Sequence, residues 1–150
     1  MATMILQKSV FIRISKQIVW HYLYQMNQWP KWSEAFHHVK ILETPKVDAK
    51  GKFFFQNGKV KSFSITRLEQ DNFLEFTMPF FTTELIIGLR AAEIPEGTGI
   101  VATVQGIGFF ESIVAKVGKR KITRILDRFL SELKSATENH VEKVEYLKQA

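Results

Sequence analysis

Apolar and polar positions alternate near the start of the chain, where Val10, Ile12 and Ile14 fall on one side of an extended segment. This period of two predicts a strand over Lys8–Ile14. The period becomes helical after Ser15, a residue type that favours the N-cap position of a helix. The apolar face of this first helix consists of Ile18, Val19, Tyr22 and Leu23.

A second short helix is indicated by Pro30, which suits a first helical turn, and we expect this helix to end near Phe36. Trp29 and Trp32 flank the proline three residues apart, so this segment must pack against a large apolar surface. We expect Trp29 to anchor the helix to the core. Trp32, one turn further on, is the candidate for contact with an internal cavity.

Six further strands follow, each ended by a turn signal. The strongest signal is Asn57-Gly58, a pair that favours tight two-residue hairpins. Because the connections are short, consecutive strands should be antiparallel. The expected strands are Val39–Glu43, Lys52–Gln56, Lys59–Glu69, Phe73–Met78, Thr82–Glu93 and Gly99–Gly108.

The last third of the chain predicts one long helix, Phe109–Lys148. One face of this helix is apolar: Ala115, Ile122, Ile125, Leu126, Phe129, Leu133, Ala136, Val144 and Leu147. As a straight rod it would be about 60 Å long at 1.5 Å per residue, whereas a domain of this size is about 40 Å across. We therefore expect a bend or a close approach at Gly118, with the tail after Asn139 partly exposed.

This order of elements predicts an α+β fold in a single domain, residues 1–150. A seven-stranded antiparallel sheet and one long helix can bury both apolar faces only if the sheet curves around the helix. The first strand can complete the sheet by pairing with the last. The expected architecture is a helix-grip fold, with two short helices after the first strand.

Three short motifs reinforce this expectation: Val19-Trp20, Trp29-Pro30-Lys31-Trp32 and Gly97-Thr98-Gly99-Ile100-Val101. With the order of elements around them, they make the chain similar to the START-like (SRPBCC) superfamily, and within it to the polyketide cyclase/dehydrase group. The resemblance extends from Lys8 to about Leu133. It implies a deep cavity between sheet and helix that binds lipids, hormones, polyketides or other apolar molecules, and only some members are enzymes.

An internal cavity is also suggested by the chain's 13 phenylalanines, more than a core of this size needs. A curved sheet facing one helix leaves more volume than one helical stripe can fill. The residues that we expect to contact a ligand are Trp32, Phe36, Phe55, Phe63, Phe76, Phe81, Glu84, Arg90, Phe110, Val114 and Gly118. Glu84 and Arg90 are included because they interrupt an apolar strand and could orient a ligand.

Catalytic and metal-binding patterns are sparse. His37 and His38 are adjacent, so on a strand they point to opposite faces and cannot share a metal ion. His21 is expected on a polar helix face and His140 on the apolar face of the last helix, and no carboxylate is positioned to orient either one. The sequence contains no nucleophile elbow, phosphate loop or metal-ligand spacing, so we expect no metal or cofactor and assign no catalytic residue.

The net charge of +6 raises nucleic acid or an anionic membrane as partner classes. We nevertheless interpret the basic residues as solvated surface and expect no nucleic-acid partner, since no aromatic-basic recognition motif accompanies them. The lysines of the central region lie in and beside turns: Lys46, Lys50, Lys52, Lys59 and Lys61. The helical row of Arg120, Arg124 and Arg128 is interpreted in the same way.

No segment approaches the ~18 consecutive apolar residues of a membrane-spanning helix, and a chain with no cysteine suits the reducing cytoplasm. We expect a monomer or a weak homodimer. The leading hypothesis is a non-catalytic binder or carrier of a small apolar ligand. A cyclase- or dehydratase-like enzyme that uses inward polar residues is the first alternative. A partner-protein binding module, which would need an exposed apolar patch, is the second.

Overall fold

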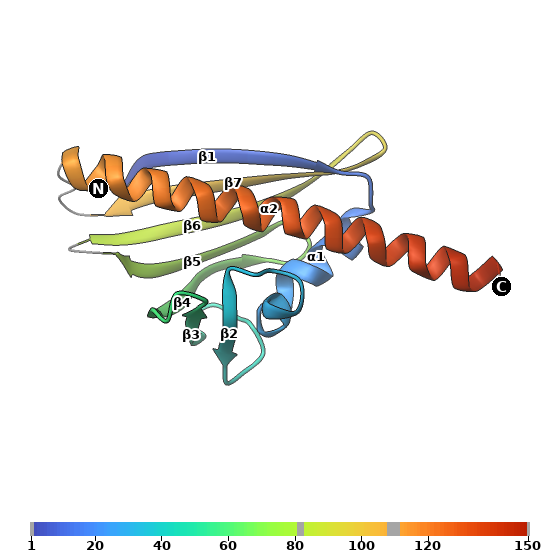
Figure 1. The fold of residues 1–150 in the computed structure, drawn as a ribbon, viewed down its shortest axis with the longest axis horizontal. Coiled ribbons are helices and arrows are strands. Elements are labelled where there is room, and N and C mark those ends of the chain that lie inside the picture. The colour runs from blue at the N-terminus through green and yellow to red at the C-terminus, as the bar shows by residue number, and fades with distance from the viewer. Residues whose placement is uncertain (1, 81–82, 108–111, 150) are drawn as a thin grey trace.

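Strands and one long helix make up most of the chain in the computed structural model (Figure 1). The structure describes residues 2–80, 83–107 and 112–149, with side chains for 4–80, 83–106 and 118–140. The elements are β1 Ala2–Ile12, α1 Lys16–Tyr24, η1 Met26–Lys31, β2 Phe36–Ile41, β3 Lys50–Phe55, β4 Val60–Glu69, β5 Phe73–Phe80, β6 Thr83–Ile94, β7 Gly97–Ile107 and α2 Ser112–Gln149.

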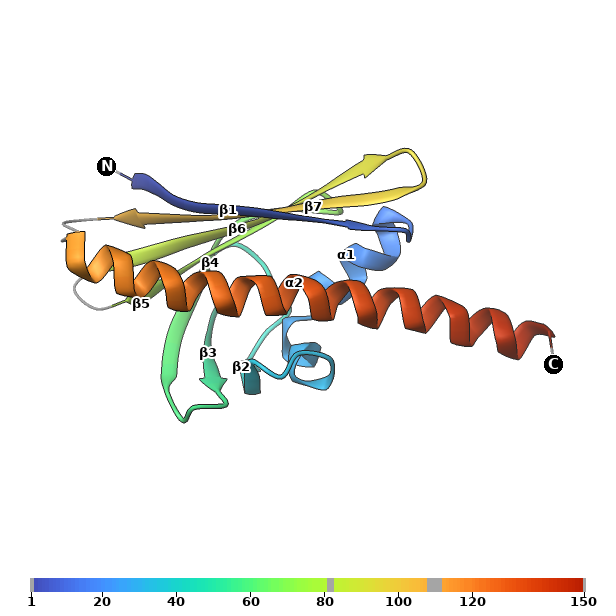
Figure 2. The ribbon, with the colours of Figure 1, turned by 45° about the horizontal axis from the view of Figure 1, so that its top comes forward.

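The strands form one antiparallel sheet in the order β1-β7-β6-β5-β4-β3-β2. The chain runs as a meander from β2 to β7, and β1 pairs with β7, as the sequence predicted. The sheet curls so that β2, β3 and β4 turn toward the side of α2 (Figures 1 and 2). The helix-grip architecture is thus confirmed.

The hairpin between β3 and β4 lies where Asn57-Gly58 predicted it, but its loop is longer than two residues, since the Gly58 backbone N–H donates a 3.0 Å hydrogen bond to the Phe55 carbonyl. Gly58 adopts a φ of 89°, a conformation in which glycine is favoured over other residues. The Lys59 backbone N–H donates a 2.9 Å hydrogen bond to Oδ1 of Asn57. These two features fix the register in which Phe54 lies opposite Val60.

Two element boundaries differ from the prediction. β1 spans Ala2–Ile12 instead of Lys8–Ile14, because β7 supplies pairing partners as far as Ile107. The second short helix, η1, is a 3₁₀-helix that ends at Lys31, and Phe36 already begins β2. Pro30 therefore lies near the end of this helix and not in its first turn.

α2 crosses the concave side of the sheet as one uninterrupted helix, Ser112–Gln149 (Figures 1 and 2). Of the bend or close approach expected at Gly118, the structure shows a buried glycine and a helix that continues through it without interruption. The excess length is accommodated at the C-terminal end, where the last turns extend beyond the sheet. Residues at helical spacing pack into the core: Leu126, Phe129, Leu130 and Leu133.

Candidate functional site

A cavity of about 290 Å³ lies between the concave face of the sheet and α2. Most of the side chains around it are apolar, and the sheet contributes inward-facing positions of six strands, β2 to β7. The lining residues are Trp29, Phe36, Phe53, Phe55, Asn57, Lys59, Lys61, Phe76, Met78, Phe80, Leu85, Ile87, Leu89, Val104, Lys121, Ile122, Ile125, Leu126 and Phe129. An apolar hollow with a few polar groups is the usual form of a small-molecule site.

One end of the cavity is closed by packed aromatic rings. The Trp29 ring lies 4.9 Å from Phe129 of α2 and 5.6 Å from Phe36 of β2, measured between ring centroids. Phe53 is parallel to Trp29 at 6.0 Å and contacts Phe76 at 5.4 Å. Trp29 and Phe53 are each only 1% exposed, so water is excluded from this end.

Trp29 is held in place by polar contacts on both sides of η1. Its indole N–H donates a 3.2 Å hydrogen bond to the Leu23 carbonyl at the end of α1. Just after η1, the Ser33 hydroxyl and the Glu34 backbone N–H donate to the two carboxylate oxygens of Glu132 at 2.9 and 2.8 Å. Arg128 forms ion pairs with both Glu34 and Glu132. The closed end of the cavity is therefore fastened to α2.

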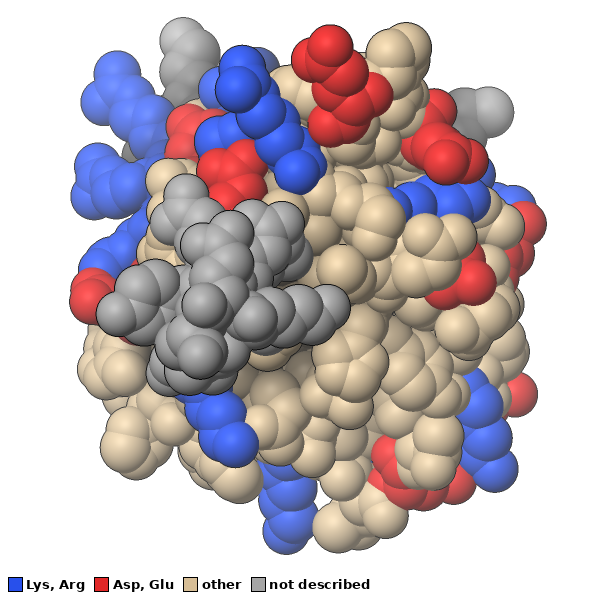
Figure 3. All heavy atoms as spheres, turned by 90° about the vertical axis from the view of Figure 1, so that its right-hand side faces the viewer, with Lys and Arg blue, Asp and Glu red and all other residues tan. Residues whose placement is uncertain are grey.

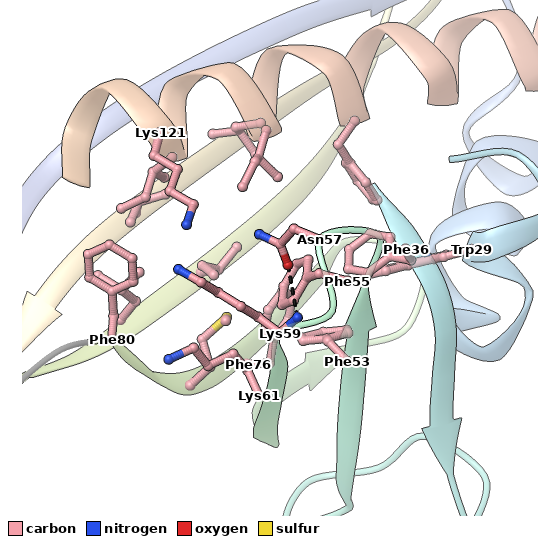
Figure 4. A pocket seen from close by; sticks show the side chains of 18 of the residues that line it. Trp29, Phe36, Phe53, Phe55, Asn57, Lys59, Lys61, Phe76, Phe80 and Lys121 are labelled. Carbon is pink, nitrogen blue, oxygen red and sulfur yellow. Dashed lines mark hydrogen bonds between the residues drawn. The ribbon is translucent and has the colours of Figure 1, made fainter. Parts of the chain in front are cut away.

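The other end opens between the β3–β4 hairpin and the N-terminal half of α2. Apolar lining residues here are half-buried: Phe55, Phe80, Ile87, Ile122 and Ile125. Four polar side chains lie among them: Asn57, Lys59, Lys61 and Lys121. Figure 4 shows Lys59 and Lys121 extending toward one another across this opening.

The lysines at the opening affect one another. The pKa of Lys121 is lowered from its ordinary value of 10.5, first by a hydrogen bond that Lys59 donates to its amine. Burial and the positive charges of Lys59 and Lys61 lower it further. No described acidic residue lines the cavity to offset this positive charge.

Three of the eleven expected ligand-contact residues line the cavity: Phe36, Phe55 and Phe76. Five others belong to the described part of the chain but do not line it: Trp32, Phe63, Glu84, Arg90 and Gly118. Phe63 lies behind the cavity wall, stacked on Phe53 at 4.2 Å. The side chains of Phe81, Phe110 and Val114 lie outside the described residues.

Trp29 anchors its helix to the core as expected, but it also makes the cavity contact that was expected of Trp32. Trp29 lines the cavity, whereas Trp32 packs against Tyr22 and Phe129 at its edge. The reason is the tighter 3₁₀ winding of η1 and the hydrogen bond to Leu23, which turn Trp29 inward.

Glu84 and Arg90 were expected to face inward, and the structure shows that this is wrong. Both are exposed on the outer face of β6, while Leu85 and Leu89 are buried on the inner face. The Arg90 guanidinium lies 4.4 Å from the ring centroid of Phe73, which it covers from solvent. Neither residue can orient a ligand in the cavity.

The histidines give no catalytic or metal site within the described residues. His21, His37, His38 and His140 are all exposed. His140 was expected on the buried face of α2, but it lies at the surface, with its ring 5.8 Å from that of Tyr22. Among the described residues, no group of three or more His, Asp or Glu side chains could hold a metal ion.

Figure 3 shows the face of the molecule at which α2 extends beyond the sheet. No continuous stripe of described basic residues crosses this face. Lysine and arginine side chains on this face are interspersed with aspartate and glutamate. Separately, no described helix combines the length and the apolar character needed to cross a bilayer.

Several solved structures share this arrangement. The di-domain ARO/CYC protein StfQ from the steffimycin biosynthetic pathway aligns with a TM-score of 0.77 and 12% identity, over 94% of this chain and 52% of StfQ. The chain has the START-like helix-grip fold. The Zhui aromatase/cyclase from Streptomyces sp. R1128 aligns with a TM-score of 0.71 and 12% identity, over 94% of this chain and 96% of Zhui. Ara h 8.0201 aligns with a TM-score of 0.64 and 13% identity, over 90% of this chain and 99% of its own.

These similarities concern the START-like fold alone. The chain spans about half the length of StfQ, 52% of that chain. No protein-family model and no curated protein sequence matches the chain. Because one fold hosts many functions, function has to be argued from the residues of the cavity.

The lysines at the opening were not recognised in the sequence as site residues, although two patterns point to them. In β4, Lys61 alternates in step with the buried Phe63 and Ile65, so its side chain starts from the inner face. In α2, Lys121 precedes the lining residue Ile125 by four positions and so shares its side of the helix. The sequence pattern was interpreted as placing Lys61 on the solvated surface, and it predicted no role for Lys121.

Proposed function

We propose that this protein binds a small hydrophobic molecule in the cavity between the sheet and α2. The observation that carries the proposal is the cavity itself, about 290 Å³ with a mostly apolar lining. This volume is close to the lower end of the range for ligand pockets, about 300–1,000 Å³. The START-like fold of the solved structures supports the proposal at the level of architecture.

An acid–base enzyme is the less favoured alternative. General acid–base catalysis needs a titratable group within reach of the bound substrate. No described histidine, aspartate or glutamate lines the cavity, and its titratable lining groups are lysines. These lysines have no described acidic residue in the cavity with which to form an acid–base pair, so binding without turnover fits the described residues better.

A partner-protein module is also less favoured. Such a module needs a contiguous exposed apolar patch. Among the described side chains, the exposed large apolar residues are few and come from different segments of the chain: Met4, Phe11, Ile18, Leu42, Val47, Val60 and Ile94. The accessible apolar side chains are instead concentrated in the cavity between the sheet and α2.

The proposal is tested with N-phenyl-1-naphthylamine, an uncharged fluorophore whose emission rises in apolar sites. Wild-type protein should bind it, and Ile125→Trp should weaken binding at least tenfold because the larger side chain fills the cavity. Ser131→Trp, which places the same side chain at an exposed position of α2, is the control and should bind normally. Equal affinity of Ile125→Trp and wild type would show that the probe binds elsewhere and would refute the proposal.

A further inference from the structure

Three lysines converge on the open end of the cavity from different parts of the chain. Lys59 follows the hairpin turn, Lys61 lies on β4, and Lys121 lies on α2. Their side chains line the same hollow as the aromatic rings, and Figure 4 shows them at the end away from Trp29. The cavity is therefore strongly polarised, with an aromatic closed end and a cationic opening.

Among the described side chains, these three lysines lack the acidic partners that other lysines have. Lys46 pairs with Glu43 at 3.2 Å and Lys134 with Glu138 at 3.1 Å. Within the described side chains, Lys59, Lys61 and Lys121 take part in none of the ion pairs.

Such a cluster of like charges is unfavourable in the ligand-free protein. The pKa of Lys121 is lowered first by a hydrogen bond with Lys59 and by burial, and the positive charges of Lys59 and Lys61 lower it further. A bound anion would relieve that repulsion.

We propose that the ligand is an amphiphile with an anionic head group, which Lys59, Lys61 and Lys121 bind while its apolar body fills the cavity. This inference rests on the proposed function, because it assigns the ligand class of the same cavity. Ammonium groups form charge-assisted hydrogen bonds with carboxylates and phosphates alike. The ligand enters with its apolar end first, since the closed end offers only rings and aliphatic side chains to the ligand.

The test compares ligands with one tail and different heads. Decanoate, decyl phosphate and uncharged 1-decanol are each titrated against protein loaded with N-phenyl-1-naphthylamine, at low salt and near neutral pH. One or both anionic ligands should displace the probe at least tenfold more effectively than decanol. Added NaCl should reduce this advantage and leave decanol unchanged, because salt screens charge–charge attraction.

Two triple variants with the same net charge test whether the preference for anionic ligands depends on the lysines at the opening. Replacing Lys59, Lys61 and Lys121 together by glutamine should abolish the advantage of the anionic ligands while decanol binds as before. Replacing the exposed Lys31, Lys52 and Lys119 by glutamine removes the same net charge away from the opening and should preserve the advantage. The comparison of decanoate with decanol on wild-type protein remains decisive if the first triple variant fails to fold.

Three outcomes would overturn the inference. Equal binding of both anions and decanol by wild type would show that the head group is not recognised, while leaving the proposed function intact. An undiminished preference in the Lys59, Lys61 and Lys121 variant would place the anion elsewhere. Displacement by acetate as effective as that by decanoate would show a simple anion site without a role for the cavity. Failure of the uncharged probe and decanol to bind would instead count against the proposed function.

Discussion

The Ser33 hydroxyl donates a 2.9 Å hydrogen bond to Oε1 of Glu132, joining the segment after η1 to the middle of α2. The second oxygen of the same carboxylate accepts the Glu34 backbone N–H at 2.8 Å. Ser33 is 1% exposed, so its hydroxyl has no access to bulk water as an alternative partner. One side chain of α2 thus fixes the segment that carries Trp29 into the closed end of the cavity.

Glu132→Ala should reduce the free energy of unfolding by about 2 kcal/mol, because it leaves a buried hydroxyl and a backbone N–H without their acceptor. Urea denaturation measures this loss. The control is Asp127→Ala, which removes an exposed carboxylate 3.6 Å from Lys8 and should cost about 0.5 kcal/mol or less. If both variants lost the same free energy of unfolding, the Ser33–Glu132 contact would contribute no more to stability than the exposed Lys8–Asp127 ion pair.

Arg90→Ala should leave ligand affinity within about twofold of wild type, because Arg90 lies on the outer face of the sheet. It should reduce stability by about 1 kcal/mol through loss of its contact with the Phe73 ring. Probe titration and urea denaturation of the same sample separate the two effects. A clear loss of affinity at unchanged stability would place Arg90 at the binding site after all.

Lys121→Gln should slightly raise the melting temperature near pH 7. A lysine with a lowered pKa binds its proton less tightly in the folded state than in the unfolded state, so its charge opposes folding at neutral pH. The gain should shrink as the pH rises toward the ordinary lysine pKa of 10.5, where wild-type Lys121 is itself neutral in the folded state. Lys119→Gln, at an exposed neighbouring position, should change little. A destabilised Lys121→Gln protein would contradict the repulsion argument.

Glu138 should contribute to stability in a pH-dependent way. Burial acts to raise its pKa, but hydrogen bonds from the Arg13 backbone N–H and from Lys134 outweigh burial and lower the pKa from 4.5. The folded state therefore favours the carboxylate, and its contribution is present above pH 4.5 and lost as the pH falls through the folded-state pKa. Glu138→Gln should be less stable than wild type at pH 7, and the difference should narrow below pH 4.5. If the stability difference between wild type and Glu138→Gln stayed the same from pH 7 to below pH 4.5, the pKa of Glu138 would not be lowered in the folded state.

The fold could be predicted because its signals are local. Alternation specified the strands, and Asn57-Gly58 fixed a hairpin. The orientation of Glu84 and Arg90 could not be predicted, because both faces of β6 carry apolar residues and alternation alone does not say which face is buried. On neighbouring β5, Phe73 is an outer-face aromatic residue covered by arginines, so aromatic character was no guide either.

The candidate site was predicted only in part for a related reason. Phenylalanines mark a cavity but do not show which of them face it, and Phe63 turned out to stack behind Phe53. The cationic opening depends on the curl of the sheet, which brings Lys61 of β4 opposite Lys121 of α2. No local sequence pattern predicts that these two lysines are close, because they meet only when the sheet and α2 pack together in the folded protein.

The central claim, that a ligand occupies the space between sheet and α2, is tested most directly by NMR with methyl-labelled isoleucine. Wild-type protein is titrated with uncharged 1-decanol, and each isoleucine methyl signal is followed. The account predicts large shifts for Ile87, Ile122 and Ile125, which line the cavity, and none for the exposed Ile18 and Ile94. Shifts confined to Ile18 and Ile94, or no shifts at saturating decanol, would contradict it.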